Sequence, residues 1–342
     1  MKQGQIIYSC IILAIVLLFF GNLFIGSVHI PAGKVIDILL GKPVERTAWE
    51  NIILQSRLPQ VITALLSGAA LAVSGLMLQT LFRNPLAGPS ILGISDGANL
   101  GVAIVMLYMG GTIVGGVYSI SGSLAVVLAA LTGATLVLAL IVYFSGKLKN
   151  SIMVLIIGMM IGYLASSGIT VLNYISSAES VRSFIMWGMG NFSGVALAQI
   201  PLYATIILGG ILFAVLLIKP LNAFLLGERY AANLGVHIKR TRILILICTG
   251  LLTAAVTAFC GPVSFIGLAV PHVARLLLGT SNHKMLVPVT ILLGAVVAAI
   301  CNLLTIIPIS TGVLPLNAVT PILGAPIIIY VIINRKNIQY FN

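Results

Sequence analysis

The side chains that could carry out chemistry are few in this sequence, and they form no known catalytic pattern. The chain has six acidic residues, four histidines and four cysteines. It contains no GxxxxGKS or GxxxxGKT loop for nucleotide phosphates, no HExxH zinc motif and no GxSxG serine motif. The cysteines form no CxxC pair, and no histidine stands four residues from another metal ligand. We therefore expect no enzyme, no metal site, no bound cofactor and no ATP hydrolysis by this chain itself.

One acidic residue, Asp96, lies near the start of an apolar segment. A carrier driven by protons or sodium usually needs charged or chelating groups in the middle of the membrane. A single carboxylate near a helix end is weak support for such coupling. We favour the alternative that Asp96 caps a broken helix.

The most informative polar segment is 219–242. It contains one acidic residue, Glu228, and several basic residues. A short helix around 225–234, a glycine stop at Gly235 and a basic run could form a unit that lies under a helical bundle and docks on a cytoplasmic protein. A basic amphipathic stretch that rests on anionic membrane lipid is the alternative that composition leaves open.

The composition places the chain in a membrane. Of 342 residues, 18 are Lys or Arg and 6 are Asp or Glu, so that 7% are charged, whereas 60% are hydrophobic. A soluble globular chain has roughly 25% charged residues. With a mean hydropathy of +1.18 the chain is typical of a polytopic membrane protein. This excludes a disordered chain, a secreted disulfide scaffold and, despite the net charge of +12, a soluble protein that binds nucleic acid.

A helix that crosses a bilayer needs about 20 mostly apolar residues. Ten segments meet this description: 6–28, 58–82, 91–108, 119–145, 151–174, 200–218, 243–260, 262–279, 286–306 and 314–333. The eighth contains Gly267 and Pro271, so we expect it to be short or kinked and packed against other helices. The sequence therefore predicts an all-α integral membrane protein with about ten transmembrane helices in a single domain, 1–342.

Basic residues in the connections predict the orientation, because cytoplasmic loops carry an excess of Lys and Arg. With the N-terminus inside, 13 of the 18 fall on the inner side: Lys2, Arg83, Lys147, Lys149, Lys219, Arg229, Lys239, Arg240, Arg242, Arg275, Lys284, Arg335 and Lys336. Five fall outside: Lys34, Lys42, Arg46, Arg57 and Arg182. This distribution predicts that both termini are cytoplasmic.

Small residues and one internal similarity indicate how the helices pack. Two sets of small residues at four-residue spacing predict close contacts within one bundle: Ala64, Gly68 and Ala72, and Gly158, Gly162 and Ser166. The stretch 88–94 also resembles 261–268, with one residue inserted. The two stretches are five spans apart, so they would face opposite ways, as in an inverted-topology repeat. Chance recurrence of Gly and Pro between membrane helices is the alternative.

Several short motifs then point to one family. They are Ser56-Arg57-Leu58-Pro59, Phe82 to Ala87, Leu92 to Ala98, Leu226 to Val236, Phe265 to Arg275 and Pro315 to Pro326. Each motif is weak alone, but their common order across nearly the whole chain is specific. The chain resembles permeases of the FecCD/BtuC type, the transmembrane subunits of type II ABC importers for iron–siderophores, haem and cobalamin.

This resemblance implies a ten-helix subunit of the cytoplasmic (inner) membrane that dimerises, usually with a second copy of itself. Two ATP-binding subunits, which hold ATP and Mg, would lie below it, and an extracytoplasmic substrate-binding protein would dock above it. The expected cargo is a metal chelate, with iron–siderophore favoured over cobalamin and haem. An ion-coupled secondary transporter with inverted repeats is the alternative function.

The resemblance also implies roles for particular residues. Segment 221–238 is similar to the coupling helix that sits in a cleft of the ATPase, through Glu228, Arg229, Ala231, Ala232, Asn233, Leu234 and Gly235. Its small residues would allow close contact, and its charged residues would form charge-assisted hydrogen bonds with the ATPase. A cytoplasmic gate would consist of Asn84, Pro85 and Leu86 facing Ser151 and Ile152, because an apolar constriction closes a pore without charge.

On the outer face, Arg57 matches an arginine that in this family pairs with acidic residues of the binding protein. The family's next arginine corresponds to Gln60 here, and the connection around 306–314 has no basic residue. Arg46 or Arg182 could substitute, although a contact with lipid is an equal alternative for either. For Arg275, on the inner side, the sequence leaves open helix-end carbonyls and the ATPase interface.

Overall fold

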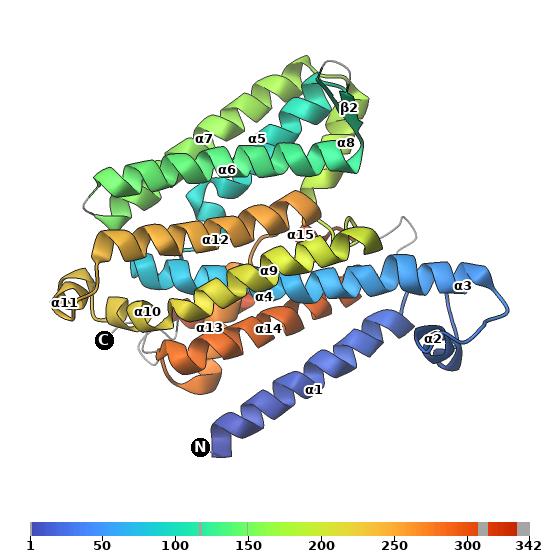
Figure 1. Cartoon of the computed structure of the whole chain (residues 1–342), viewed down its shortest axis with the longest axis horizontal. Coiled ribbons are helices and arrows are strands. Elements are labelled where there is room, and N and C mark those ends of the chain that lie inside the picture. The colour runs from blue at the N-terminus through green and yellow to red at the C-terminus, as the bar shows by residue number, and fades with distance from the viewer. Residues whose placement is uncertain (1, 116–117, 149, 307–313, 334–342) are drawn as a thin grey trace.

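The computed structural model describes residues 2–115, 118–148, 150–306 and 314–333. In these residues the chain folds as a bundle of long helices that run roughly side by side (Figure 1). In chain order the helices are α1 (Lys2–Phe24), α2 (Ala32–Leu39), α3 (Thr47–Asn51), α4 (Leu58–Phe82), α5 (Ile94–Ala103), α6 (Ser123–Lys147), α7 (Ser151–Ile175), α8 (Ala178–Gly188), α9 (Ile200–Leu216), α10 (Ile218–Leu225), α11 (Glu228–Asn233), α12 (Ile238–Cys260), α13 (Ile266–Leu278), α14 (His283–Thr305) and α15 (Leu316–Ile333).

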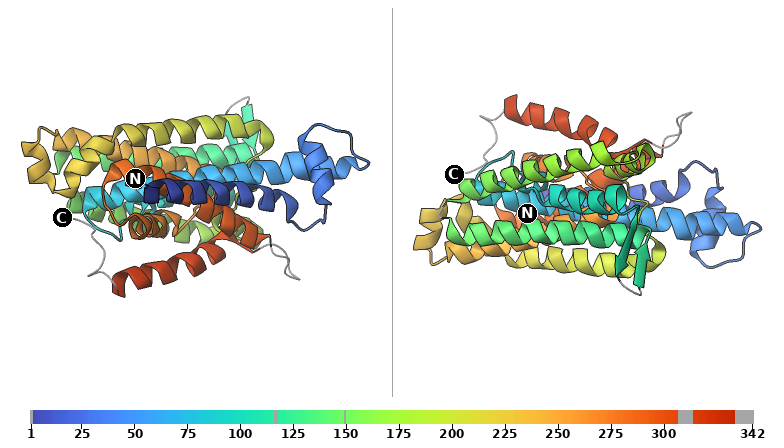
Figure 2. Two further views of the ribbon diagram at one scale, coloured as in Figure 1. Left: turned by 90° about the horizontal axis from the view of Figure 1, so that it is seen from below. Right: turned by 90° about the horizontal axis from the view of Figure 1, so that it is seen from above.

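The long helices form three groups (Figure 1). Helices α5, α6 and α7 lie together, and α12 connects them to α4, which is buried along most of its length. Helices α13 and α14 pack on the other side of α4, and α1 packs along α14. Figure 2 shows α15 at one side of the bundle, where it contacts α13 and α14.

Ten apolar helices occupy the positions of the ten predicted membrane segments. Among the described residues, seven helical stretches are long and apolar enough to cross a bilayer: 5–24, 47–82, 123–147, 151–175, 197–216, 238–260 and 283–305. Three shorter apolar helices cover 94–108, 266–278 and 316–331. The helix at the eighth segment, α13, has 13 residues with Pro271 inside it.

The all-α expectation is wrong in one place. A two-stranded antiparallel hairpin, β1 (Thr112–Gly115) and β2 (Tyr118–Ser121), precedes α6, so the predicted span 119–145 becomes a helix that begins at Ser123. The strands contain β-branched and aromatic residues, which favour extended backbone. Glycines with positive φ, Gly111 before the hairpin and Gly122 after it, separate the hairpin from the neighbouring helices.

Other boundaries also differ from the predicted ones. The second membrane helix begins at Thr47, because α3, a π-helical turn (Ile52–Arg57) and α4 are continuous. The short helix predicted around 225–234 is two helices, α10 and α11, since Gly227 interrupts them with a φ of 100°. Helices α2 and α8 lie in connections where no helix was predicted.

Helix α4 packs closely because glycines let its backbone meet that of its neighbours. A Cβ added at Gly68 would overlap the carbonyl oxygen of Gly294 on α14, and one added at Gly75 would overlap that of Gly267 on α13. The second predicted set of small residues also makes close contacts, since a Cβ at Gly158 would lie 3.0 Å from the carbonyl oxygen of Leu92. Close backbone approach replaces the hydrophobic effect as the main source of helix association in lipid.

The chain between α12 and α13 is not helical, and Asn317 of α15 binds its exposed backbone groups. Asn317 Oδ1 accepts hydrogen bonds from the Ser264 amide and hydroxyl, both at 3.1 Å. Asn317 Nδ2 donates to the carbonyl oxygens of Pro262, at 2.6 Å, and Gly188, at 3.3 Å. Irregular backbone at this depth needs such partners because lipid supplies none.

The two similar stretches, 88–94 and 261–268, pack against each other. A Cβ added at Gly267 would lie 2.8 Å from Pro89 Cδ, and one at Gly88 would lie 3.8 Å from Leu268 Cβ. Their local conformations differ: Pro89–Leu92 forms a 3-10 turn, whereas 261–264 has no regular secondary structure and Phe265, with φ 65°, is the N-cap of α13. The inverted repeat stays a prediction.

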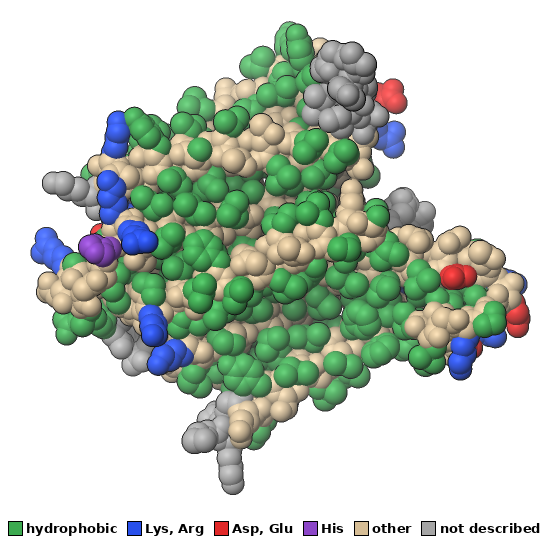
Figure 3. Space-filling view, in the orientation of Figure 1, with side chains coloured by type: hydrophobic (Ala, Val, Ile, Leu, Met, Phe, Trp, Pro, Cys, Tyr) green, Lys and Arg blue, Asp and Glu red, His purple; other side chains and the backbone are tan. Residues whose placement is uncertain are grey.

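Charged side chains gather at the two ends of the bundle, and hydrophobic side chains cover most of the face between them (Figure 3). We call the end formed by α10, α11 and the start of α12 the basic end. At the opposite end, basic side chains have acidic neighbours: Lys34 lies 3.7 Å from Glu45, and Lys42 lies 3.6 Å from Asp37. Lys149, Arg335 and Lys336, which were counted on the inner side, lie outside the described residues.

We predict that Gly75→Ala lowers the stability of the protein in detergent. The added methyl group has no room beside the backbone of α13, and overpacking of this kind costs about 2 kcal/mol. The measurement is the temperature at which monodisperse protein is lost. Gly209→Ala on α9 is the matched control, because nothing lies within 4 Å of its added Cβ. Equal transition temperatures for the two variants would contradict this packing.

Candidate functional site

The segment that the sequence singled out, 221–238, forms the tip of the basic end. Gly227 and Gly235, both with positive φ, bound the six-residue helix α11. Five of the seven predicted coupling residues are exposed: Arg229, Ala232, Asn233, Leu234 and Gly235. Ala231 is fully buried and Glu228 is half-buried, so these two side chains face the bundle instead of the surroundings.

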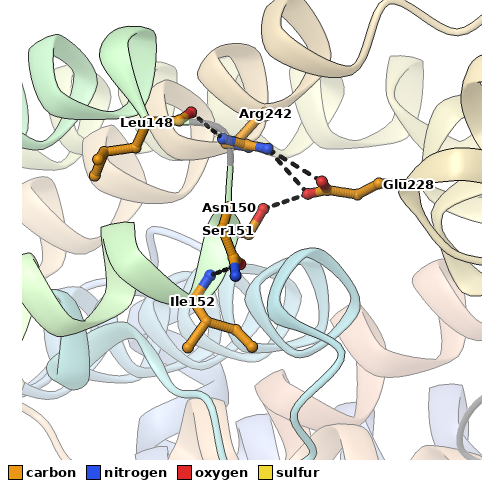
Figure 4. A network of polar contacts seen from close by, with 6 residues as sticks. All are labelled: Leu148, Asn150, Ser151, Ile152, Glu228 and Arg242. Atoms are coloured by element: carbon orange, nitrogen blue, oxygen red, sulfur yellow. Dashed lines mark hydrogen bonds and ion pairs between the residues drawn. The ribbon is translucent and has the colours of Figure 1, made fainter.

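Glu228 connects α11 to two other helices (Figure 4). Arg242 of α12 donates to both carboxylate oxygens, at 3.0 Å to Oε1 and 3.2 Å to Oε2. The Ser151 hydroxyl, at the first residue of α7, donates to Oε1 at 2.5 Å. Arg242 also donates to the Leu148 carbonyl at 2.9 Å, so one guanidinium joins α11 to the end of α6. Glu228 was expected to form a charge-assisted hydrogen bond with the ATPase. In the structure its carboxylate accepts such bonds from Arg242 of the same chain.

The two predicted gate segments both lie beside the start of α11. Asn150 Oδ1 accepts from the Ile152 amide at 2.9 Å and so caps α7, and the Ile152 side chain is exposed. In the other segment, Asn84 Oδ1 accepts from the Leu86 amide at 2.9 Å, and the Leu86 side chain is exposed. A Cβ added at Gly227 would lie 3.2 Å from Nη1 of Arg83, the residue before Asn84.

A buried polar network behind the gate segment Asn84–Leu86 was not predicted from the sequence. His272 Nε2 is 2.8 Å from the Pro85 carbonyl oxygen, and Arg275 Nη1 donates to Gln79 Oε1 at 2.7 Å. Gln79 Nε2 in turn donates to the Leu268 carbonyl at 3.2 Å. Arg275 thus binds a side-chain amide in the interior of the bundle. Positions 272 and 275 lie on one face of a helix, and this spacing was the available signal.

Arg57 is buried, and it binds the end of α1. Its Nη1 donates to the carbonyl oxygens of Leu23, at 2.7 Å, and Phe24, at 3.2 Å, and its Nη2 donates to that of Val28. Gly26 is required beside it, because a Cβ there would overlap the guanidinium. Arg57 was expected to present its charge to a binding protein, but its guanidinium is occupied by carbonyl oxygens at the end of α1 and just after it.

An open cavity of about 400 Å³, which Arg57 helps to line, lies at the end opposite the basic end. It is also lined by the residues that follow α1, by the π-helical turn, and by residues near α8 and α15, among them Ile25, Gln60, Met189, Ser193 and Pro315. Two other basic residues of this end are exposed. Arg46 lies over the ring of Trp49, 5.0 Å from its centroid, and Arg182 is on α8. Residues 307–313 of the connection 306–314 lie outside the described residues.

Asp96 lies in the first turn of α5, whose N-cap is Gly93. A Cβ added at Gly162 of α7 would lie 2.6 Å from Asp96 Oδ2, so the carboxylate fills the space that this glycine leaves. A negative charge is favoured near a helix N-terminus. Asp96 therefore belongs to the contact between α5 and α7.

Comparison with known proteins identifies the family. The FecCD transport family matches residues 13–334. An ABC transporter permease protein from Methanocaldococcus jannaschii is 32% identical over 97% of both chains. The vitamin B12 import system permease protein BtuC from Klebsiella pneumoniae is 34% identical over 82% of both chains. A solved inward-facing structure of a metal-chelate type ABC transporter matches with a TM-score of 0.82 and 28% identity, covering 97% of this chain and 99% of the other.

These findings confirm the resemblance that the motifs indicated. They also show that the alternative of an ion-coupled secondary transporter is wrong, since members of this family are permease subunits of ABC transporters. With its apolar helices, the protein is a multi-pass protein of the cytoplasmic membrane. The chain belongs to the FecCD transport family, the membrane permeases of ABC transporters.

Proposed function

We propose that this chain forms half of the pathway through which a metal chelate is imported, driven by ATP hydrolysis in separate subunits. The observation that carries this proposal is the surface of α11 at the basic end, which projects from the bundle (Figure 1). It offers small residues, Ala232 and Gly235, together with one outward charge, Arg229. Such a surface allows close contact with a groove in a partner protein.

Exposed apolar side chains next to these residues support docking of an ATPase. Tyr230 and Leu234 lie four residues apart along α11 and its C-cap, Leu226 precedes the break at Gly227, and all three side chains are exposed. Under the positive-inside rule the basic end, which contains Lys239 and Arg240, faces the cytoplasm. Large apolar side chains exposed to water in a row mark a protein contact. Both chain termini are then cytoplasmic, as the sequence predicts.

The second half of the pathway is proposed to be another copy of this permease or a related one. Helix α7 supports this, because several large side chains along it are exposed, including Ile152, Ile156, Tyr163 and Tyr174. Leu86 and Ile152, also exposed, are placed to close the cytoplasmic end of the pathway between the two copies. An apolar constriction there would block passage by excluding water.

At the opposite end we propose that an extracytoplasmic binding protein docks around the open cavity beside Arg57. The exposed arginines Arg46 and Arg182 are available to pair with acidic residues of that protein. Arg57 would act from below, by holding the end of α1 in place. The cargo is a metal chelate. The resemblance to the family favours an iron–siderophore, its broadest class of substrate, whereas the Klebsiella relative is named for vitamin B12.

We predict ATP-dependent uptake in proteoliposomes that contain this permease with its ATPase and binding protein. Arms with a ferric siderophore and with cobalamin distinguish the two cargoes. Gly235→Asp, expressed at the normal level, is expected to lower uptake at least about tenfold, because it places a charged side chain in the proposed ATPase contact. Uptake that continues without ATP, or survives Gly235→Asp, would contradict the proposal.

We also predict that Arg57→Ala lowers stability more than Arg46→Ala does. Removal of Arg57 leaves carbonyl oxygens of α1 without their charged donor, and each such hydrogen bond is worth about 2 kcal/mol. Arg46 is exposed, so its loss should leave the unfolding temperature in detergent nearly unchanged. If Arg57→Ala kept full stability and only weakened binding-protein affinity, a direct docking role would be indicated instead.

A further inference from the structure

We propose that Glu228 is a positioning residue that transmits the movement of α11 to the cytoplasmic gate on α7. This inference rests on the proposed function, because it assumes that an ATPase moves α11. Glu228 is the only acidic residue in segment 219–242, which is otherwise rich in basic residues. Its carboxylate is directed into the bundle, away from the proposed ATPase surface (Figure 4).

An ion pair with Arg242 fixes Glu228 to α12. The Arg242 side chain is 3% exposed, whereas that of Glu228 is 31% exposed. Both carboxylate oxygens accept from the same guanidinium nitrogen, at 3.0 and 3.2 Å. A guanidinium shielded in this way holds its partner more firmly than a surface ion pair does. The start of α11 is therefore fixed to the first turns of α12.

Glu228 also contacts α7, the helix that carries the proposed gate residue Ile152. Ser151, the first residue of α7, donates to Glu228 Oε1, and the next residue is Ile152 of the proposed gate. Arg242 also binds the Leu148 carbonyl on the other side of the connection between α6 and α7. The Glu228–Arg242 pair thus holds both sides of the connection that carries the gate residue. A displacement of α11 has to move this connection or break these bonds.

The residue before Glu228 lies close to the other gate segment, which begins at Asn84. Gly227, immediately before Glu228, lies against the guanidinium of Arg83, which directly precedes Asn84. Gly227 and Glu228, at the start of α11, therefore lie next to Arg83, which precedes one gate segment, and Ser151, which belongs to the other. Energetic coupling between distant sites is carried by contiguous contacts of this kind when they join elements with two arrangements.

The carboxylate suits this task because one group accepts from two helices at once. Oε1 accepts from both Ser151 and Arg242, and Oε2 accepts from Arg242. Glu228→Gln keeps the size of the side chain and one acceptor oxygen but removes the charge that Arg242 binds. Ser151→Ala removes only the hydrogen bond to the gate helix and leaves the ion pair in place. Glu228→Gln therefore tests the ion pair that fixes α11, and Ser151→Ala tests the hydrogen bond that reaches the gate helix.

The experiment uses the complete importer in proteoliposomes, with ATP hydrolysis and substrate uptake measured side by side. We expect Glu228→Gln to lower uptake about tenfold, within the usual range of coupling between sites, while ATP hydrolysis stays within about twofold of the unmodified complex. Ser151→Ala should lower uptake less, with hydrolysis unchanged. Lys284→Gln is the matched control, because this exposed basic residue at the start of α14 lies outside segment 219–242 and should leave both rates unchanged.

A second readout follows the gate itself. Cys10 is exposed and the three other cysteines are buried, so a Cys10→Ser background allows labelling of Ile152→Cys with a thiol reagent. In the unmodified network, ATP should change the labelling rate at position 152. With Ser151→Ala that change should become smaller although hydrolysis continues. A purely structural role of Glu228 would not alter the response to ATP in a complex that assembles normally.

Two outcomes would overturn the inference. One is normal uptake by both variants. The other is a loss of assembly and hydrolysis with Glu228→Gln while Ser151→Ala keeps full uptake and a full labelling response, since the pair would then only fold α11. If Glu228→Gln does not fold, the Ser151→Ala results decide alone. Absence of ATP-driven uptake by the unmodified complex would instead refute the proposed function.

Discussion

The structure depends on one constraint: in lipid, every backbone polar group needs a partner within the protein. Where the helices are regular, they satisfy this themselves and approach one another through glycines, as Gly75 does with Gly267. Where the chain is irregular, one side chain supplies several bonds. Asn317 binds the backbone of Pro262 and Ser264, and Arg57 binds the carbonyls at the end of α1. The break before α13 and the end of α1 exist because these polar side chains are in place.

The same constraint explains why the long apolar runs of the sequence coincide with helices. An apolar run of about 20 residues has few structures open to it, so the ten segments overlap ten apolar helices of the described chain. Hydropathy does not describe connections. It therefore missed helices α2 and α8. It also missed the hairpin before α6, where β-branched residues and flanking glycines decide the conformation.

The direction of individual side chains was the harder problem. Motifs identified Glu228, Ser151 and Arg57, but their contacts depend on which face of a helix meets the bundle. A six-residue helix such as α11 has too few turns to show an apolar period, so nothing in its sequence indicates that Glu228 points inward. Arg57 was assigned to the docking surface because it matches an arginine of the family. The carbonyls that bind it, at the end of α1 and just after it, are more than 25 residues away in the chain and cannot be paired with it by pattern.

The inward direction of Glu228 has a consequence for the choice of partner. With its carboxylate used inside the chain, α11 shows its surroundings one charge, Arg229, among small and apolar side chains. Recognition by the proposed ATPase then depends more on the shape of its groove than on complementary charges.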